Sequence, residues 1–213
     1  MKIQKFTYNM FGVNTYVIWD EASGEAAIID PGMISRNDNS ELENFILSNS
    51  LTPKFLINTH LHIDHTLGND AVMATYSLPV HASSDDEFLG ATRSRQAEMF
   101  GIGMSSLTPV SVDHNLKNGD RLKLGNETIE IIAVPGHSPG SIAIYSPDGG
   151  FVITGDALFQ GSIGRTDLPG GNHSQLIRSI TERLLSLSPD TVVYPGHGPS
   201  TTIGYEKRMN PFL

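Results

Sequence analysis

The sequence contains no cysteine among its 213 residues. This absence excludes disulfide bonds, thiolate zinc sites and a cysteine nucleophile, so every metal ligand must offer nitrogen or oxygen. Positive charge is also scarce, because 14 Lys and Arg stand against 23 Asp and Glu, a net charge of -9. Such a surface repels phosphate backbones and anionic lipid headgroups. We therefore expect neither a nucleic-acid ligand nor a membrane partner.

Long apolar runs are absent as well. No stretch approaches the roughly 18 apolar residues that span a membrane, and residues 1–20 lack the continuous apolar core of a signal peptide. We expect a cytoplasmic protein. A chain of 213 residues can bury a full core and still fold as one unit. We predict a single domain over residues 1–213, and the sequence leaves the oligomeric state open.

Short apolar runs, each closed by Gly, Pro or Asp, alternate with helical patterns. Helices are predicted over Glu41–Leu47 and Ser174–Leu187. The predicted strands are 15–19, 25–30, 55–58, 128–134, 141–145, 151–154 and 191–194. Both halves of the chain are rich in strands. This plan predicts two sheets packed face to face with helices outside.

The segment Ser83–Leu107 is compatible with helix and carries Met99, Phe100 and Met104 close to glycines. Two interpretations stay open. The segment either lies over a site as a lid or packs as ordinary surface structure.

Five of the eight histidines follow an apolar run or lie in a turn with Gly or Pro. These are His60, His62, His65, His137 and His197. Strand ends are rigid and the loops that leave them are exposed, so such positions can bring distant side chains to one point. A shared site is predicted.

Residues 60–65 hold three imidazoles and one carboxylate. The spacing of His60 and His62 lets both rings point the same way from an extended segment. Asp64 and His65 fall past the turn and can face a second point, which suits two metals roughly 3.5–4 Å apart. A hydrogen-bonded histidine cluster without metal is the alternative interpretation.

Three further ligand candidates each follow a predicted strand and a glycine. His137 lies in the turn at 135–140, Asp156 follows Gly155, and His197 lies in the turn at 194–199. Glycine lets the backbone turn sharply and approach closely. Together with residues 60–65, these side chains make two nearly complete coordination shells.

In their order along the chain, Asp30, residues 60–65, His137, Asp156 and His197 resemble the metallo-β-lactamase superfamily, and within it the short glyoxalase II-like hydrolases. The resemblance extends through residues 155–171 and the tail 210–212. It implies an α/β fold, a four-layer αββα sandwich, without the C-terminal helical domain of full-length glyoxalase II.

The resemblance also implies the roles of the candidate residues. One metal would take His60, His62 and His137, the other Asp64, His65 and His197, with Asp156 bridging them. Asp30 would stand behind the ligands, and Asp64 would act in catalysis by orienting the attacking hydroxide. Zn, Fe and Mn fit this ligand set, and we expect two divalent ions, with zinc in first place. Adjacent divalent ions make a bridging hydroxide available near neutral pH.

The expected activity is that of a thioesterase which cleaves small S-acyl glutathione thioesters of the S-lactoyl type. Arg165 matches a lysine that contacts glutathione in glyoxalase II, and the alternative is an arginine that ties its loop to a carboxylate. Phe159 either walls the substrate pocket or packs in the core. Two tyrosines that hold glutathione in that family are replaced by Asp167 and Pro199, so the identity of the thiol stays open.

Other functions remain as alternatives. A mononuclear-iron persulfide dioxygenase shares the same motifs, including a Gly-Arg-Thr-Asp string like that at residues 164–167. A non-catalytic metal-binding module is the second alternative. The carboxylate at Asp156 counts against a β-lactamase, since those enzymes typically have a cysteine or a non-ligand at this position.

Overall fold

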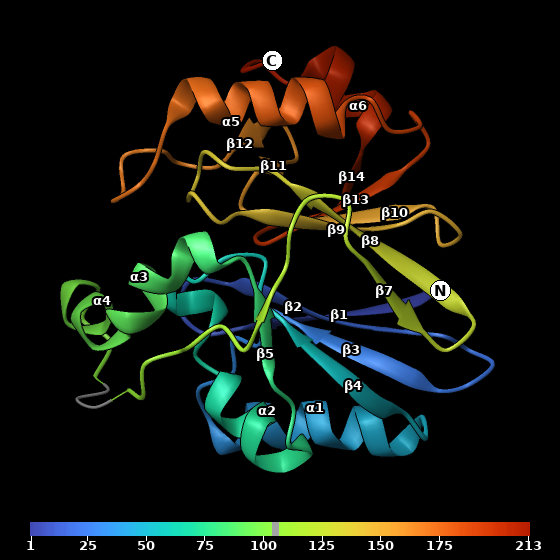
Figure 1. The fold of residues 1–213 in the computed structure, drawn as a ribbon, viewed down its shortest axis with the longest axis vertical. Coiled ribbons are helices and arrows are strands. Elements are labelled where there is room, and N and C mark those ends of the chain that lie inside the picture. Colours follow the sequence, from blue (N-terminus) through green and yellow to red (C-terminus); the bar gives the residue numbers. More distant parts are fainter. Residues whose placement is uncertain (104–106) are drawn as a thin grey trace.

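The structure is a computed structural model that describes residues 1–103 and 107–213. Two six-stranded sheets face each other and helices cover the outer side of each (Figure 1). The first sheet has the order β1 (Lys2–Tyr8), β2 (Val13–Trp19), β3 (Glu25–Ile29), β4 (Thr52–Ile57), β5 (Val80–Ala82) and β6 (His114–Asn115). The second has the order β14 (Thr201–Thr202), β13 (Val192–Pro195), β10 (Phe151–Gly155), β9 (Ile142–Ser146), β8 (Glu127–Ala133) and β7 (Arg121–Leu124). A small hairpin joins β11 (Leu158–Phe159) to β12 (Ser162–Ile163).

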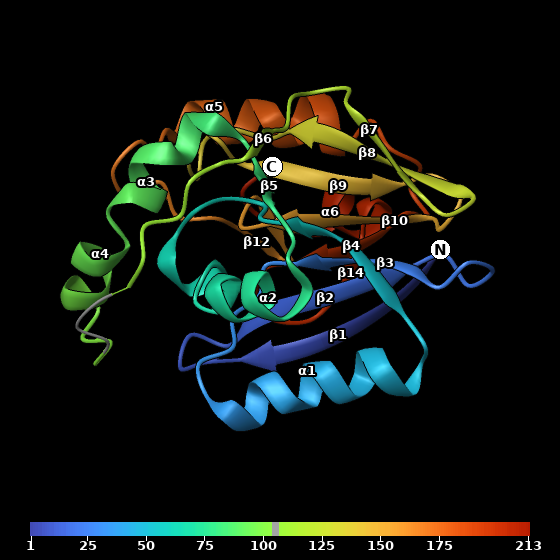
Figure 2. The ribbon, with the colours of Figure 1, turned by 60° about the horizontal axis from the view of Figure 1, so that its bottom comes forward.

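The helices form the two outer layers and one projecting end. The first sheet is covered by α1 (Arg36–Ser48) and α2 (Asn69–Tyr76). The second is covered by α5 (His173–Ser179), its π-helical continuation η3 (Ile180–Leu184), and α6 (Ile203–Met209). The short helices α3 (Glu87–Ala91) and α4 (Arg93–Met99) project beyond the strands at the left of Figure 2. The predicted four-layer αββα fold is confirmed.

The strand β3 shows why this sequence makes a two-sided sheet. Ala26 and Ile28 pack in the core under α1, whereas Ala27 and Ile29 pack between the two sheets. Successive side chains of a strand point to opposite faces, so a strand covered on both sides needs a continuous apolar run.

A capping box fixes the start of α1. The Ser35 hydroxyl accepts the Asp38 N–H at 3.1 Å, and the Asp38 carboxylate accepts the Ser35 N–H at 2.9 Å. The helix therefore begins at Arg36, five residues before the predicted start at Glu41.

The seven predicted strands correspond to β2, β3, β4, β8, β9, β10 and β13. The edge strand β1 is not among the predicted strands, and several of its residues are exposed. The helix predicted over Ser174–Leu187 ends at Leu184, where α5 has passed into a π-helical turn. In the segment Ser83–Leu107 the structure has α3 and α4. Met104 lies outside the described residues.

Strand direction gathers the predicted site residues. In the first sheet β3 and β4 are parallel. In the second, β8 and β10 both pair antiparallel with β9, and β10 is parallel to β13, so β8, β10 and β13 end at one edge. Asn14 of β2 joins the sheets there, since its side chain donates to Pro195 O at 2.9 Å.

The two faces of α1 give a test of the layer arrangement. Leu42 is 1% exposed and Leu47 is 78% exposed. Leu42→Ala should lower the free energy of unfolding by about 2–5 kcal/mol, because it empties a packed site. The matched Leu47→Ala change should stay within about 0.5 kcal/mol. Urea unfolding measures both, and equal effects would contradict the packing described.

Candidate metal centre

The seven predicted ligands lie together at the end of the sheets where the preceding strands stop. His60 and His62 follow β4, and Asp64 and His65 lie in the 3-10 turn η1 (Ile63–His65). The other three are His137 between β8 and β9, Asp156 directly after β10, and His197 after β13. Segments far apart in sequence thus meet at one place, as predicted.

The side chains form three groups of three, of which the third, His60, His65 and Asp156, joins the other two. Ligand atoms of His60, His62 and His137 lie within 4.8 Å of one another, and all three residues are buried. The ligand atoms of Asp64, His65 and His197 meet the same limit. In the first group, 2.9 Å separates His62 Nδ1 from His137 Nε2. Each group is compact enough to share one ion.

Asp156 stands between the groups. Its Oδ2 lies 3.7 Å from His137 Nε2 and 3.5 Å from His197 Nε2, and its Oδ1 lies 3.3 Å from His65 Nε2. One carboxylate therefore faces a member of the first group and two members of the second. This is the geometry that a bridging ligand requires.

Hydrogen bonds fix the ring tautomers of His65 and His60. His65 Nδ1 lies 3.0 Å from Asp30 Oδ2, an acceptor, so Nδ1 carries the proton and Nε2 keeps its lone pair. The Thr59 hydroxyl donates to the same Asp30 oxygen at 2.6 Å. It must therefore accept from His60 Nδ1, 3.1 Å away, which leaves His60 Nε2 unprotonated.

Backbone carbonyls orient two further rings in the same way. His137 Nδ1 donates to Arg165 O at 2.7 Å, and His197 Nδ1 donates to Phe11 O at 3.1 Å. In both residues the lone pair of Nε2 then points into the cluster. Asp30 supports the ring of His65 in the same way from its far side.

Buried polar atoms in the cluster lack partners. Within the described part of the chain, His60 Nε2 and Asp156 Oδ1 are buried and make no hydrogen bond. A buried polar atom without a partner lowers the stability of the fold by about 1–3 kcal/mol. Imidazoles and carboxylates are common ligands of divalent metals, so bound ions would satisfy these lone pairs. The residues present fit a pair of metal ions.

The pKa shifts differ between the two groups of the cluster. Burial lowers the pKa of His62 to about 4 and that of His60 well below its usual value, which favours the neutral, ligating form. Burial alone would raise the pKa of Asp64, but nearby His65 holds it below the ordinary value. The pKa of His65 is shifted the other way, because Asp64 and other carboxylates raise it against the effect of burial. His65 therefore has to release the proton on Nε2 when an ion binds there.

Asp86 supports the site although no sequence pattern indicated it. Its buried carboxylate accepts from Leu61 N at 3.2 Å, Ser138 Oγ at 2.7 Å and Gly140 N at 2.6 Å. It therefore ties the loop of His60 and His62 to the loop of His137. No local pattern distinguishes it from its exposed neighbour Asp85.

A pocket of about 210 Å³ opens over the cluster, with Phe11, Phe100, Leu168 and Arg165 among its walls. Arg165 thus borders the pocket, but it also ties its loop to a carboxylate, the alternative interpretation of this residue, with bonds of 2.7 and 2.6 Å to Asp167. This pair holds the pKa of Asp167 at about 2.

Phe159 does not line this pocket among the described residues. Its ring is half-buried and lies 6.3 Å, centroid to centroid, from the ring of His197.

None of the helices in residues 1–103 and 107–213 is both long and apolar enough to cross a membrane.

Comparison with known proteins agrees with this geometry. Residues 8–197 match the family model of the Metallo-beta-lactamase superfamily. An uncharacterized protein of Mycobacterium leprae (strain TN) is 41% identical over 100% of this chain and 99% of its own length. The hydroxyacylglutathione hydrolase GloC of Haemophilus influenzae is 38% identical over 100% of this chain and 98% of its own.

Two solved structures are similar over nearly their whole length. BLEG-1, described as a B3 metallo-beta-lactamase, has a TM-score of 0.88 at 36% identity and covers 100% of this chain and 99% of its own. TTHA1623, described in a di-iron-bound form, has a TM-score of 0.86 at 35% identity, and the match covers 99% of this chain and 100% of TTHA1623.

Metal content tests the two groups separately. The purified protein should carry about two divalent ions per chain. His137→Ala and His197→Ala should each lower this to about one, because each change removes a ligand from a different group. His173→Ala, at an exposed position on α5, is the matched control. Elemental analysis by mass spectrometry measures the content, and an unchanged value in both ligand variants would contradict the assignment.

The contacts of Asp86 generate a second prediction. Asp86→Ala leaves buried donors unpaired, and we expect unfolding to become easier by roughly 3 kcal/mol. Affinity for the ion at His60, His62 and His137 should fall by about 10–100-fold. Competition with a chromogenic chelator measures the affinity, with Asp85→Ala as control. A loss of equal size in the control would show that Asp86 has no particular role.

Proposed function

Because this chain belongs to the metallo-beta-lactamase superfamily, we propose that it is a two-metal hydrolase of small thioesters of the S-lactoylglutathione type. The observation that carries the proposal is the position of Asp156 between two groups of three ligands. The 38% identity with a protein named hydroxyacylglutathione hydrolase supports the choice of substrate.

The pocket itself supports attack by water. Of the described residues that line it, none carries a hydroxyl, a thiol or a primary amine. A serine, threonine, cysteine or lysine nucleophile is therefore absent from these pocket walls. Two bound divalent ions would supply an activated water and a Lewis acid for the carbonyl oxygen.

Asp64 is the residue we assign to proton handling. Its carboxylate lines the pocket, lies 3.2 Å from His197 Nε2 and is held ionised by a lowered pKa. An ionised carboxylate at this place accepts a hydrogen bond from the attacking water and orients it toward the acyl carbon. A thiolate is a good leaving group, so the reaction needs little help from a general acid.

Arg165 gives the pocket a positive side. Its guanidinium is exposed at the pocket wall and could meet a carboxylate of the thiol, although Asp167 already engages it.

We propose zinc as the metal in both positions. Iron is the second choice, which the di-iron form of the similar TTHA1623 supports.

Hydrolysis of β-lactams is a second candidate. It is favoured by one observation, the 36% identity with BLEG-1 over the whole chain. A persulfide dioxygenase with one iron shares the same motifs, so the number of bound ions and oxygen uptake, and not the ligand residues, separate it from the proposed hydrolase.

Turnover of S-D-lactoylglutathione by the purified protein tests the proposal, with Asp64→Asn as the variant. We expect hydrolysis by the wild type and a loss of kcat of at least about 100-fold in Asp64→Asn, because the carboxylate that orients the water is replaced. Metal at His60, His62 and His137 should be retained, and elemental analysis of the same samples checks this.

Parallel assays separate the alternatives. Nitrocefin hydrolysis without thioester hydrolysis would favour the β-lactam candidate. Oxygen uptake with glutathione persulfide, together with one iron per chain, would replace the hydrolase assignment altogether.

A further inference from the structure

A second cavity, of about 280 Å³, adjoins the metal pocket. The two share three wall residues, His62, Phe100 and Leu168. His62 belongs to the metal cluster, so the second cavity begins at the place where the reacting carbonyl would lie. It is a side chamber of the same site.

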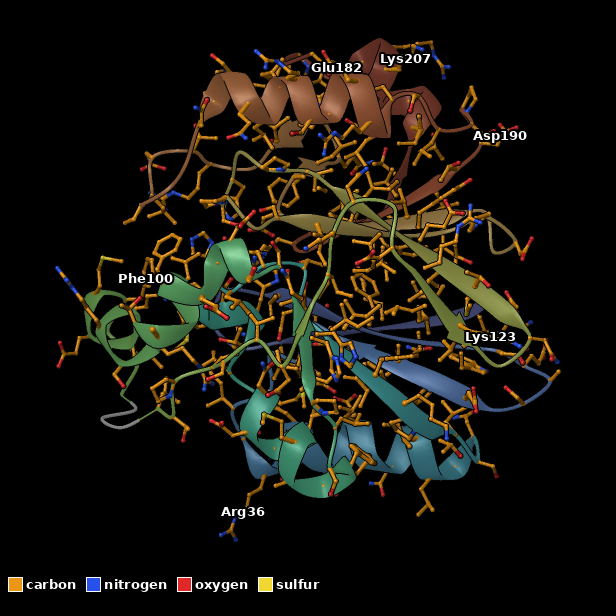
Figure 3. The ribbon with its side chains drawn as sticks, viewed as in Figure 1. Arg36, Phe100, Lys123, Glu182, Asp190 and Lys207 are labelled. Atoms are coloured by element: carbon orange, nitrogen blue, oxygen red, sulfur yellow. The ribbon has the colours of Figure 1, made fainter. Side chains whose placement is uncertain are left out.

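The walls of this chamber are mainly apolar. Phe88, Leu89 and Met99 come from α3 and α4, and Pro169 closes the opposite side next to Leu168. Phe88, Met99 and Phe100 are large apolar residues that are nevertheless exposed. Figure 3 shows Phe100 at the α4 end of the molecule, opposite Lys123 on β7. Exposed apolar side chains gathered in one concave place mark a binding surface.

Buried hydrogen bonds hold this wall against the metal-binding turn. Gln96 Nε2 donates to Leu89 O at 2.8 Å, and its Oε1 accepts Ile63 N at 3.0 Å, the first residue of η1. The buried Arg93 donates to Thr66 O at 2.7 Å, just past the end of that turn. The chamber is therefore fixed in position relative to Asp64 and His65. A chamber whose walls are already fixed favours binding, because few side chains lose conformational freedom when the ligand enters.

We propose that this chamber holds the acyl chain of the thioester and that the enzyme prefers apolar acyl groups longer than lactoyl. The inference rests on the proposed thioesterase function. An apolar cavity of about 150 Å³ is enough for benzene, so this one has room for a chain of about six carbons. The anionic thiol half is then left to Arg165, which lines the metal pocket but not the chamber.

The test is a series of S-acetyl, S-butyryl, S-hexanoyl and S-octanoyl glutathione. In the wild type kcat/KM should rise by up to roughly fourfold per added methylene as far as hexanoyl, the factor that burial of one CH2 gives. Met99→Trp fills the chamber from its wall and should abolish this rise. Met209→Trp on α6 is the matched control, because both methionines are 61% exposed, and it should keep the rise.

Each remaining outcome is decisive. Turnover of lactoyl and acetyl esters with no gain from longer chains overturns the acyl assignment and leaves the thioesterase standing. Arg95 also borders the chamber. If Arg95→Ala raises KM equally for every glutathione ester and chain length has no effect, the chamber holds the thiol instead. Absence of turnover with every thioester overturns both proposals.

Discussion

The buried carboxylate of Asp30 links the two halves of the metal centre. It accepts from His65 Nδ1 at 3.0 Å and from the Thr59 hydroxyl at 2.6 Å, and Thr59 in turn orients His60. One side chain thus sets the direction of a ring in each group of ligands. Its backbone, with φ of 50°, turns immediately after β3 to bring the carboxylate there. A non-glycine residue rarely adopts this conformation, and the surrounding bonds maintain it.

The two sheets bring the ends of several strands together at the metal centre. The strands β4, β8, β10 and β13 each lead to a ligand within a few residues of their ends. Asp86 ties the loop of His60 to the loop of His137, and Asn14 ties β2 to the end of β13. Crowding imidazoles and carboxylates in a buried place is unfavourable without ions, because polar atoms such as His60 Nε2 stay unpaired. The same crowding makes the place suitable for two cations and, beside them, for a substrate chamber walled by α3 and α4.

The ligand candidates were predictable because their chemistry is local: an imidazole after an apolar run and a glycine shows in the sequence. The layers were predictable for a similar reason, since strands such as β3 are continuously apolar. Asp86, by contrast, acts only through partners at positions 61, 138 and 140, and nothing near it in sequence marks it. The strand β1 is only partly buried and lacks the continuous apolar run that marks β3. Arg165 both lines the pocket and pairs with Asp167, so the binding and the structural interpretation of this arginine both have support.

The most direct test of this account is an anomalous diffraction map of crystals of the protein, recorded at the absorption edge of its metal. The account predicts two peaks, one among His60, His62 and His137 and one among Asp64, His65 and His197, roughly 3.5–4 Å apart with Asp156 between them. A single peak in the first group would contradict the two-metal centre and point to chemistry at one ion. No peak at the cluster would contradict the metal assignment itself.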